Sequence, residues 1–445
     1  MAPPRLPPPP PVEVPVLIDM QEELTQKAVA PVGTPLQMSV IATPATLETE
    51  LPSPAPTAGS LAIVETPKSD KGTVTVAEVV SQAPDPYAPA GGGLDGRWEE
   101  ARTRLLMARG GTPASETAVE RALQWLATHQ REDGSWRFEH QGKACDRTCD
   151  HGGTYSSTTG ATALALLPFL GHGEWQGEKG RILRQGLDYL VDRMVLSPRG
   201  GDFQEGSMYA QGLTTIALCE AYAMTGEKRW GNAAQKGIAF IENSQHEAGG
   251  WRYFPNQPGD TTVLGWQMMA LKTGSWAGLE VSGETVDKGY RFLDLVQGNR
   301  GATYGYQEAG DEPSPTAIGL LCRMHSGWNQ LDLRLQRGVV HLQEQGYSRK
   351  DMYFNYYATQ VMAHYGGPRW EAWNEPLRDY LIASQGTQGH GKGSWYFGGK
   401  HTMAGGRLCE TAFTCLILEV YYRHLPLYGG DPLEHSPPRK TTARP

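Results

Sequence analysis

The sequence predicts an all-α protein whose folded part is an (α/α)6 toroid, an outer ring of helices around an inner ring. Between residues 112 and 428 a helix, a glycine-rich aromatic turn and a second helix recur six times, at a spacing of roughly 40 to 65 residues. First helices such as AVERALQWLATHQ carry charge on one face, whereas second helices such as TGATALALLPFL are nearly uncharged. A half-solvated outer helix and an inner helix buried on all sides explain this difference.

The helix pairs follow one another along the chain, and within each pair a turn joins the first helix to the second. Two pairs have a complete turn, two have a variant of it, and two are degenerate. The expected pairs, in chain order, are 117–130 with 158–171, 178–194 with 209–226, 231–245 with 260–274, 284–297 with 314–327, 329–345 with 355–367, and 370–385 with 408–428.

The toroid is expected to span residues 111–428, between two disordered segments. Residues 1–110 are rich in Pro and Ala and show no sustained hydrophobic period, so they predict a disordered linker or tail, with a short helix near residues 97–106. Residues 429–445 predict a disordered C-terminal tail. No signal peptide and no long apolar run is present, so the chain as written is expected to be soluble. A proline-rich spacer typically connects two structural parts, and we keep a membrane anchor upstream of Met1 as an open hypothesis.

The charge of the chain argues against a nucleic-acid partner, and the surroundings of most cysteines in the sequence indicate that they are buried. A net charge of -8 and a pI near 5.9, without a basic stripe, argue against nucleic-acid binding. Four of the six cysteines lie in apolar helical runs and are expected to be buried, unreactive thiols: Cys219, Cys322, Cys409 and Cys415.

Two turns carry a recognisable motif. The segments QREDGSW (residues 130–136) and QHEAGGW (residues 245–251) have the form QxxxGxW. They resemble the repeats of squalene-hopene and oxidosqualene cyclases and of protein prenyltransferase β subunits, and the resemblance covers about residues 112–428. It implies a toroidal fold and a central cavity for an isoprenoid or other lipid. In the motif itself, Gln can bond carbonyls at the helix end, Gly turns the chain and Trp packs on the next repeat, so these residues are expected to be structural.

One carboxylate opens the third inner helix, in the stretch QPGDTTVLGWQMMAL. The resemblance places the proton donor of class II cyclases in a DxDD motif here, but the donor position falls on Gly259. Asp260 is the remaining candidate acid; it is also a candidate N-cap, or a group that faces the cavity and binds a ligand. Backbone N–H groups and the helix dipole would lower the pKa of a capping Asp260, whereas a donor to an alkene needs a neutral acid.

Aromatic side chains near the starts of inner helices are the candidates for lining the cavity, where π faces suit an apolar chain or a carbocation. Ordinary packing between the two rings is the alternative explanation. The expected lining residues are Tyr155, Tyr209, Trp266, Tyr353, Tyr356 and Tyr357, with His364 as a polar group at the same rim.

A loop in the first pair holds two cysteines and a histidine, Cys145, Cys149 and His151. They could supply three ligands to Zn²⁺, but a local disulfide and two free thiols remain equally open, because no second pair of Cys or His is obvious nearby. The zinc pattern of prenyltransferases is not met, since no cysteine follows Asp260 at two residues. No other cofactor is expected.

Two functions of different classes follow. In the first, a terpene cyclase-like protein binds an isoprenoid or other lipid in the central cavity, and the loss of the DxDD motif leaves its catalytic competence in question. In the second, a toroid without catalytic activity binds a lipid or a protein at the end of a proline-rich spacer.

Overall fold

The computed structural model describes residues 94–428, except residues 142–144, 146–147, 204, 206 and 426. The disorder expected of residues 1–93 and 429–445 lies outside the described residues. The outer helices are α2 (Pro113–Thr128), α4 (Gly177–Arg193), α6 (Lys228–Glu242), α8 (Gly283–Val296), α10 (Leu333–Gln345) and α12 (Gly367–Ser384). The inner helices are α3 (Thr158–His172), α5 (Met208–Thr225), α7 (Thr261–Trp276), α9 (Pro313–His325), α11 (Met352–Tyr365) and α13 (Gly406–Leu418).

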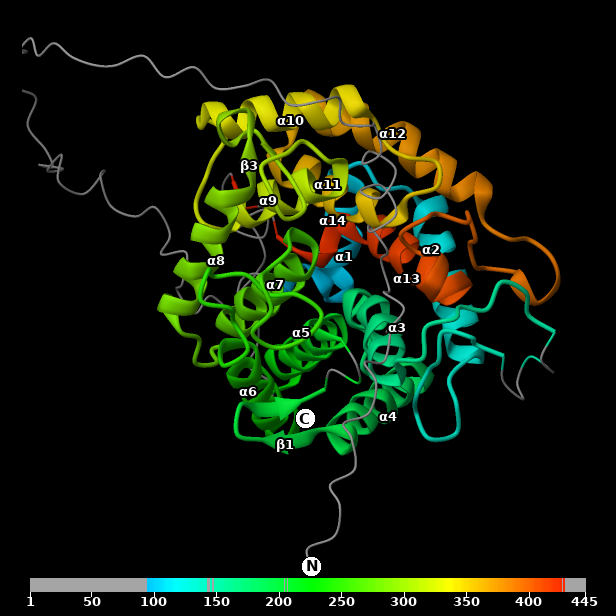
Figure 1. The fold of residues 1–445 in the computed structure, drawn as a ribbon. Helices are drawn as coiled ribbons and strands as arrows, with labels where there is room; N and C mark the ends of the chain where they lie inside the picture. The colour runs from blue at the N-terminus through cyan, green and yellow to red at the C-terminus, as the bar shows by residue number, and fades with distance from the viewer. Residues whose placement is uncertain are drawn as a thin grey trace, which may run out of the picture. The chain divides into compact units, whose positions relative to one another are not determined.

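The inner helices form a closed ring. Each packs on the next, from α3 to α13, and α13 packs back on α3. The outer ring closes where α12 packs on α2. Figure 1 shows the outer helices at the periphery and the inner helices within them. The predicted (α/α)6 toroid is confirmed, and all six helix pairs lie where the periodicity places them.

Short hairpins occupy two of the turns that lack the complete motif. Strands β1 (Val195–Ser197) and β2 (Gly200–Asp202) pair antiparallel between α4 and α5, and β3 (Gln297–Gly298) pairs with β4 (Thr303–Tyr304) between α8 and α9. These hairpins turn the chain from the outer to the inner ring, as the motif does elsewhere.

The complete motif ties neighbouring outer helices together. The Gln130 side chain donates from Nε2 to the carbonyl of Gly134 in its own turn and to that of Ile182 in the next outer helix, each at 3.0 Å. The Trp136 indole donates to the carbonyl of Leu126 in the last turn of α2. Gly134 has φ of 86°, as a left-handed turn requires. The structural role expected for these residues is confirmed.

The same bonds recur around the ring and finally close it. Gln245 bonds Gly249 and Thr285 in the same way. In the last pair, Gln385 Nε2 donates to the carbonyl of Ala118 in α2 at 2.8 Å, so one buried amide joins the end of the toroid to its beginning.

The folded unit begins before the expected boundary at residue 111. Helix α1 (Glu99–Ala108) and the preceding 3-10 turn η3 (Asp95–Arg97) pack against α14 (Val420–Arg423). Arg97 is fully buried, and its guanidinium donates to both oxygens of Glu220, at 2.8 and 3.0 Å. Arg423 binds the same carboxylate at 2.9 Å. The expected short helix therefore exists, but it belongs to the toroid and covers the end of the ring at which α5 terminates.

The four cysteines expected in the core, Cys219, Cys322, Cys409 and Cys415, are all buried and unpaired. No helix among residues 94–428 with the gaps given above is both long and apolar enough to span a bilayer.

Candidate functional site

The inner helices begin at one mouth of the ring, and short polar side chains cap four of them. Ser157 caps α3, Ser207 caps α5 and Asp351 caps α11, each by accepting a backbone N–H of the first turn. Asp260 caps α7 by accepting from Thr262 N at 3.0 Å and from Val263 N at 2.8 Å. The equivalent positions thus carry capping residues of different chemistry, which indicates that the first task of Asp260 is to start its helix.

The two oxygens of Asp260 have different surroundings. Oδ1 accepts both backbone bonds and a third from the Thr262 hydroxyl at 2.6 Å. Oδ2 is buried and has no hydrogen-bond partner among the described residues, and Arg252 Nε lies 3.8 Å from it. The Nε of Arg252 also lacks a hydrogen-bond partner within that part of the chain. These two atoms therefore form a long ion pair without a direct hydrogen bond, which a ligand hydroxyl or a water could bridge.

Burial raises the pKa of Asp260 to about 6, against the lowering effect of the bonds from Thr262 and Val263. The capping bonds lower this pKa as expected, but its net shift is upward, because the carboxylate is completely shielded from solvent and desolvation outweighs the hydrogen bonds. The residue is thus both a cap and a carboxylate that can be protonated in mildly acidic solution.

Tyrosines surround Asp260. The Tyr209 hydroxyl lies 2.7 Å from Thr262 Oγ1, which in turn donates to Asp260. Tyr253 packs on Tyr209 with ring centroids 6.1 Å apart, and its hydroxyl lies 2.9 Å from that of Tyr306. Burial and then the charge of Asp260 raise the pKa of Tyr209 and of Tyr306, so both phenols stay protonated. Sequence reasoning missed Tyr253 and Tyr306, which lie on loops outside the inner helices.

Below this group, aromatic rings fill the centre of the ring. Trp266 of α7 stacks on Tyr356 of α11, with centroids 5.7 Å apart and planes at 12°. It also packs against Phe413 of α13, with the ring centroids 6.2 Å apart. Helices α7 and α13 are opposite one another in the ring order, so this contact spans its diameter. Tyr353 and Tyr357 complete the cluster. These rings were expected to line a cavity; the structure shows them packed against one another.

Tyr155 and His364, which were expected at the same rim, lie at opposite ends of the ring. Tyr155 is buried at the mouth before α3 and packs on Phe138 at 5.9 Å, and its hydroxyl has no partner among the described residues. His364 does not share that rim. It lies eleven residues after Tyr353 in α11, about 16 Å along the helix, at the opposite end of the ring. A helix that begins at one mouth ends at the other, and the sequence alone did not separate the two.

Two cavities lie at that opposite end. One, of about 20 Å³, is lined by Leu271, Val286 and His325 among others. Another, of about 10 Å³, is lined by Trp276 and His424 among others. Each has room for about one water molecule, so neither can hold an isoprenoid chain.

Gly259, the position that the sequence resemblance gives to the cyclase proton donor, has no room for a side chain. A Cβ built on Gly259 would lie 2.5 Å from the Cα of Gly250 and 3.0 Å from the ring of Phe292. Both neighbours are packed, so the backbone of this turn has no room for an aspartate.

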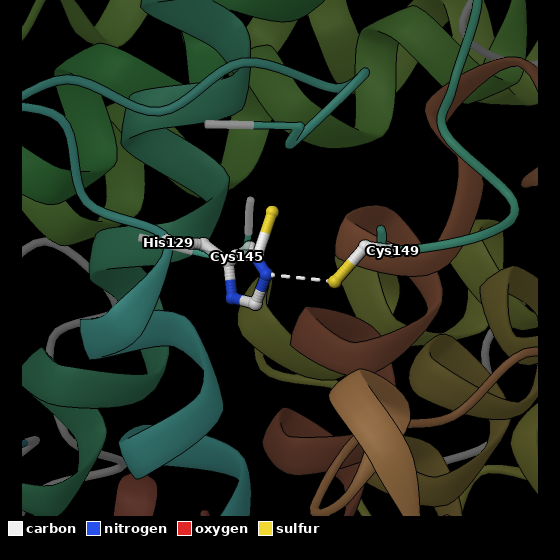
Figure 2. Close-up of side chains that lie close together, drawn as sticks. All are labelled: His129, Cys145 and Cys149. Atoms are coloured by element: carbon white, nitrogen blue, oxygen red, sulfur yellow. Dashed lines mark hydrogen bonds between the residues drawn. The ribbon is translucent and has the colours of Figure 1, made fainter. Parts of the chain in front are cut away.

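A second cluster lies where the end of α2 meets the following loop (Figure 2). The ligand atoms of His129, Cys145 and Cys149 lie within 4.8 Å of one another, and all three residues are buried. His129 Nε2 lies 3.1 Å from Cys149 Sγ. His151, expected to complete this group, is absent from it: the ring is partly exposed and stacks on Tyr396 at 3.9 Å. The correct partner, His129, is separated from the cysteines by a turn motif, so proximity in sequence pointed to the wrong histidine.

Comparisons with known proteins agree on the fold. Residues 102–224 match the model of the squalene-hopene cyclase C-terminal domain, which confirms the resemblance that the QxxxGxW repeats indicate. Among curated proteins, none matches this sequence.

Solved structures with the same architecture have diverse activities. An inactive variant of the GH76A α-1,6-mannanase of Salegentibacter sp. HEL1_6, in complex with α-1,6-mannotetrose, is 9% identical with a TM-score of 0.50, over 70% of this chain and 99% of the mannanase. The type II terpene cyclase MstE from Scytonema is 10% identical with a TM-score of 0.48, over 69% of this chain and 97% of the cyclase. At such identities a likeness shows the fold and leaves the activity to the site.

Proposed function

We propose that this protein binds an isoprenoid alcohol or a similar amphiphilic lipid at the Asp260 mouth of the inner ring and does not cyclise it. The proposal rests on Oδ2 of Asp260, which is buried beneath a group of tyrosines and lies 3.8 Å from Arg252 Nε without a direct hydrogen bond between them. Buried polar atoms in native proteins almost always have partners, and a ligand hydroxyl would supply one here.

The mouth also offers a surface for the apolar part of the ligand. Tyr253 is half-buried and Phe254 beside it is 39% exposed, so two aromatic side chains are accessible next to the tyrosines that cover Asp260. Aromatic faces bind apolar chains without demanding one exact shape. We expect the hydroxyl of the lipid to reach Asp260 and the chain to lie along Tyr253 and Phe254.

The packed centre of the ring leaves no space in which a polyene could cyclise. A polyene must fold inside a cavity next to the acid that protonates it, and here aromatic side chains occupy the space beneath Asp260. The donor position is Gly259, which has no room for a side chain.

Equilibrium binding of radiolabelled geranylgeraniol tests the proposal. The lipid should bind the wild-type chain, and Tyr253→Ala should weaken binding about three- to tenfold through the lost aromatic contact. Tyr365→Ala, which removes a partly buried tyrosine at the far end of the ring, is the matched control and should bind like the wild type. Absence of binding, or equal loss in both variants, would overturn the proposal.

A second candidate is a cyclase in which Asp260 itself is the acid. The raised pKa of Asp260, about 6, favours it, because a buried carboxylic acid among aromatic rings has the environment of a proton donor. Product formation separates the two candidates.

A further inference from the structure

The loop between Phe138 and Gly153 is closed by hydrogen bonds within itself, and its two cysteines lie beside His129 at the end of α2. Gly153 N donates to Phe138 O at 2.9 Å, and Gln141 bonds Cys149 O at 3.0 Å. Within that closed loop the two thiols of Cys145 and Cys149 come close to each other and to His129 without forming a disulfide.

A second imidazole, that of His140, lies beside this cluster, although its ring nitrogens are not within 4.8 Å of all three ligand atoms. His140 is 4% exposed, and its Nε2 has no hydrogen-bond partner among the described residues. Its ring centroid is 5.6 Å from that of His129, with the planes at 77°. Two imidazoles on one tetrahedral ion, each with a metal–nitrogen bond of about 2.0 to 2.1 Å, have centroids about 5 Å apart. The observed separation is slightly larger, so His140 must move toward His129 to bind the same ion.

Both histidines are oriented by their other ring nitrogen. His129 Nδ1 lies 2.7 Å from the carbonyl of Trp125, and His140 Nδ1 lies 3.2 Å from that of Phe138. A carbonyl accepts only, so each Nδ1 carries the proton and each Nε2 keeps a lone pair. This is the arrangement by which proteins orient a metal-binding histidine. Trp125 also packs against both rings, with centroids 4.0 and 5.3 Å away.

We propose that this loop holds a structural zinc ion through His129, Cys145 and Cys149, whose ligand atoms already lie together, and that the neighbouring His140 moves in as the fourth ligand. Two sulfur and two nitrogen ligands are the set that Zn²⁺ takes in closed tetrahedral sites. All four residues are buried, so no coordination position is left for a substrate, and the role is structural. The ion fastens the loop to the end of α2 near the ring closure, where Cys149 and Trp125 both contact the His390 carbonyl.

Metal analysis of the purified full-length chain tests the site. The wild type, reduced and reconstituted with Zn²⁺, should carry about one zinc per chain after dialysis. Cys149→Ser and His140→Ala should each lose most of it. His151→Ala is the matched control: it removes the neighbouring histidine that stacks on Tyr396, and it should retain full zinc.

A measurement on the unmodified chain guards against variants that fail to fold. Replacement of zinc by Co²⁺ should give the strong visible absorption and thiolate charge-transfer bands of a tetrahedral site, and removal of the metal by a chelator should lower the melting temperature. The proposal is overturned if the reduced wild type binds no stoichiometric Zn²⁺ or Co²⁺. A Cys145–Cys149 disulfide found by mass analysis would also overturn it if the protein still bound no metal once that bond was reduced. It is also overturned if His151→Ala loses the metal while His140→Ala keeps it, since His151 would then be the ligand in place of His140.

Discussion

At the scale of single residues, Asp260 shows how one position can serve two physical demands. Its Oδ1 satisfies the first N–H groups of α7, while burial without a partner for Oδ2 raises its pKa to about 6. The sequence predicted the cap correctly, because Pro-Gly before and an apolar helix after are local signals. It could not predict the pKa, because the complete burial of the carboxylate depends on packing by residues distant in sequence.

Asp260→Asn should change the pH dependence of stability in one direction. The pKa of Asp260 is about 6 in the folded chain and about 3.9 in the unfolded chain, so between these values the folded state binds the extra proton. The contribution of this group therefore becomes more favourable as pH falls from about 6 to about 4, by up to about 3 kcal/mol, and is at its least favourable above pH 6.

Urea unfolding of both proteins at pH 4.5 and 7.5 measures the effect. Asn caps a helix about as well as Asp, so the variant should be at least as stable as the wild type at pH 7.5 and should lose the advantage at pH 4.5. Asp332→Asn, at the partly buried cap of the outer helix α10, should not show this crossover. Parallel pH profiles for wild type and Asp260→Asn would contradict the raised pKa.

At the scale of elements, the QxxxGxW turn acts as a clasp between neighbouring helix pairs. Its parts were predictable, since Gln, Gly and Trp each have a local reason to be at a helix end. The ring closure by Gln385 was not, because its partner Ala118 is 267 residues away and nothing local indicates it.

Gln385→Ala should weaken this closure. The change removes two hydrogen bonds from a buried amide, to the carbonyls of Ala118 and Gly393, and leaves both carbonyls without that donor. A cost of about 1 to 3 kcal/mol in unfolding free energy is expected, with faster amide exchange in α2 and α12. Gln185→Ala, on the exposed face of α4, should be neutral within about 0.5 kcal/mol. Equal effects of the two substitutions would show that the closure bond contributes nothing.

The zinc cluster marks the limit of sequence reasoning at this scale. Cys145 and Cys149 were visible as a pair, but the histidines were not, since His129 reads as the last residue of an amphipathic helix and His140 as part of a polar loop. The order of two histidines followed within twenty residues by two cysteines was the available signal. The turn that brings them together depends on the packing of Trp136 into the first pair.

At the scale of the whole molecule, the segment before α2 completes the toroid. Composition predicted a tail up to residue 110, because proline and alanine dominate residues 1–93 and the hydrophobic period is weak as far as α1. The structure instead buries Arg97 between Glu220 and a carbonyl of α14. A charged residue buried by a distant partner has no signature in local sequence, so the boundary was placed too late.

Glu220→Gln should destabilise the chain strongly. Arg97 and Arg423 share the Glu220 carboxylate, and its loss would leave two buried guanidinium groups without their common counter-charge. A loss of about 3 to 5 kcal/mol in the free energy of urea unfolding is expected. Glu178→Gln, which breaks an exposed pair with Arg181, should cost less than about 0.5 kcal/mol. A small effect of Glu220→Gln would show that the N-terminal segment is not essential to the closed ring.

The central claim, that the mouth binds an isoprenoid without cyclising it, is tested most directly by mass-spectrometric analysis of lipid extracts after incubation with geranylgeraniol and squalene. We predict that geranylgeraniol is recovered unchanged at about one molecule per chain and that no cyclised product forms from either lipid. A cyclic product that forms with the wild type and disappears with Asp260→Asn would contradict the account and assign the acid to Asp260.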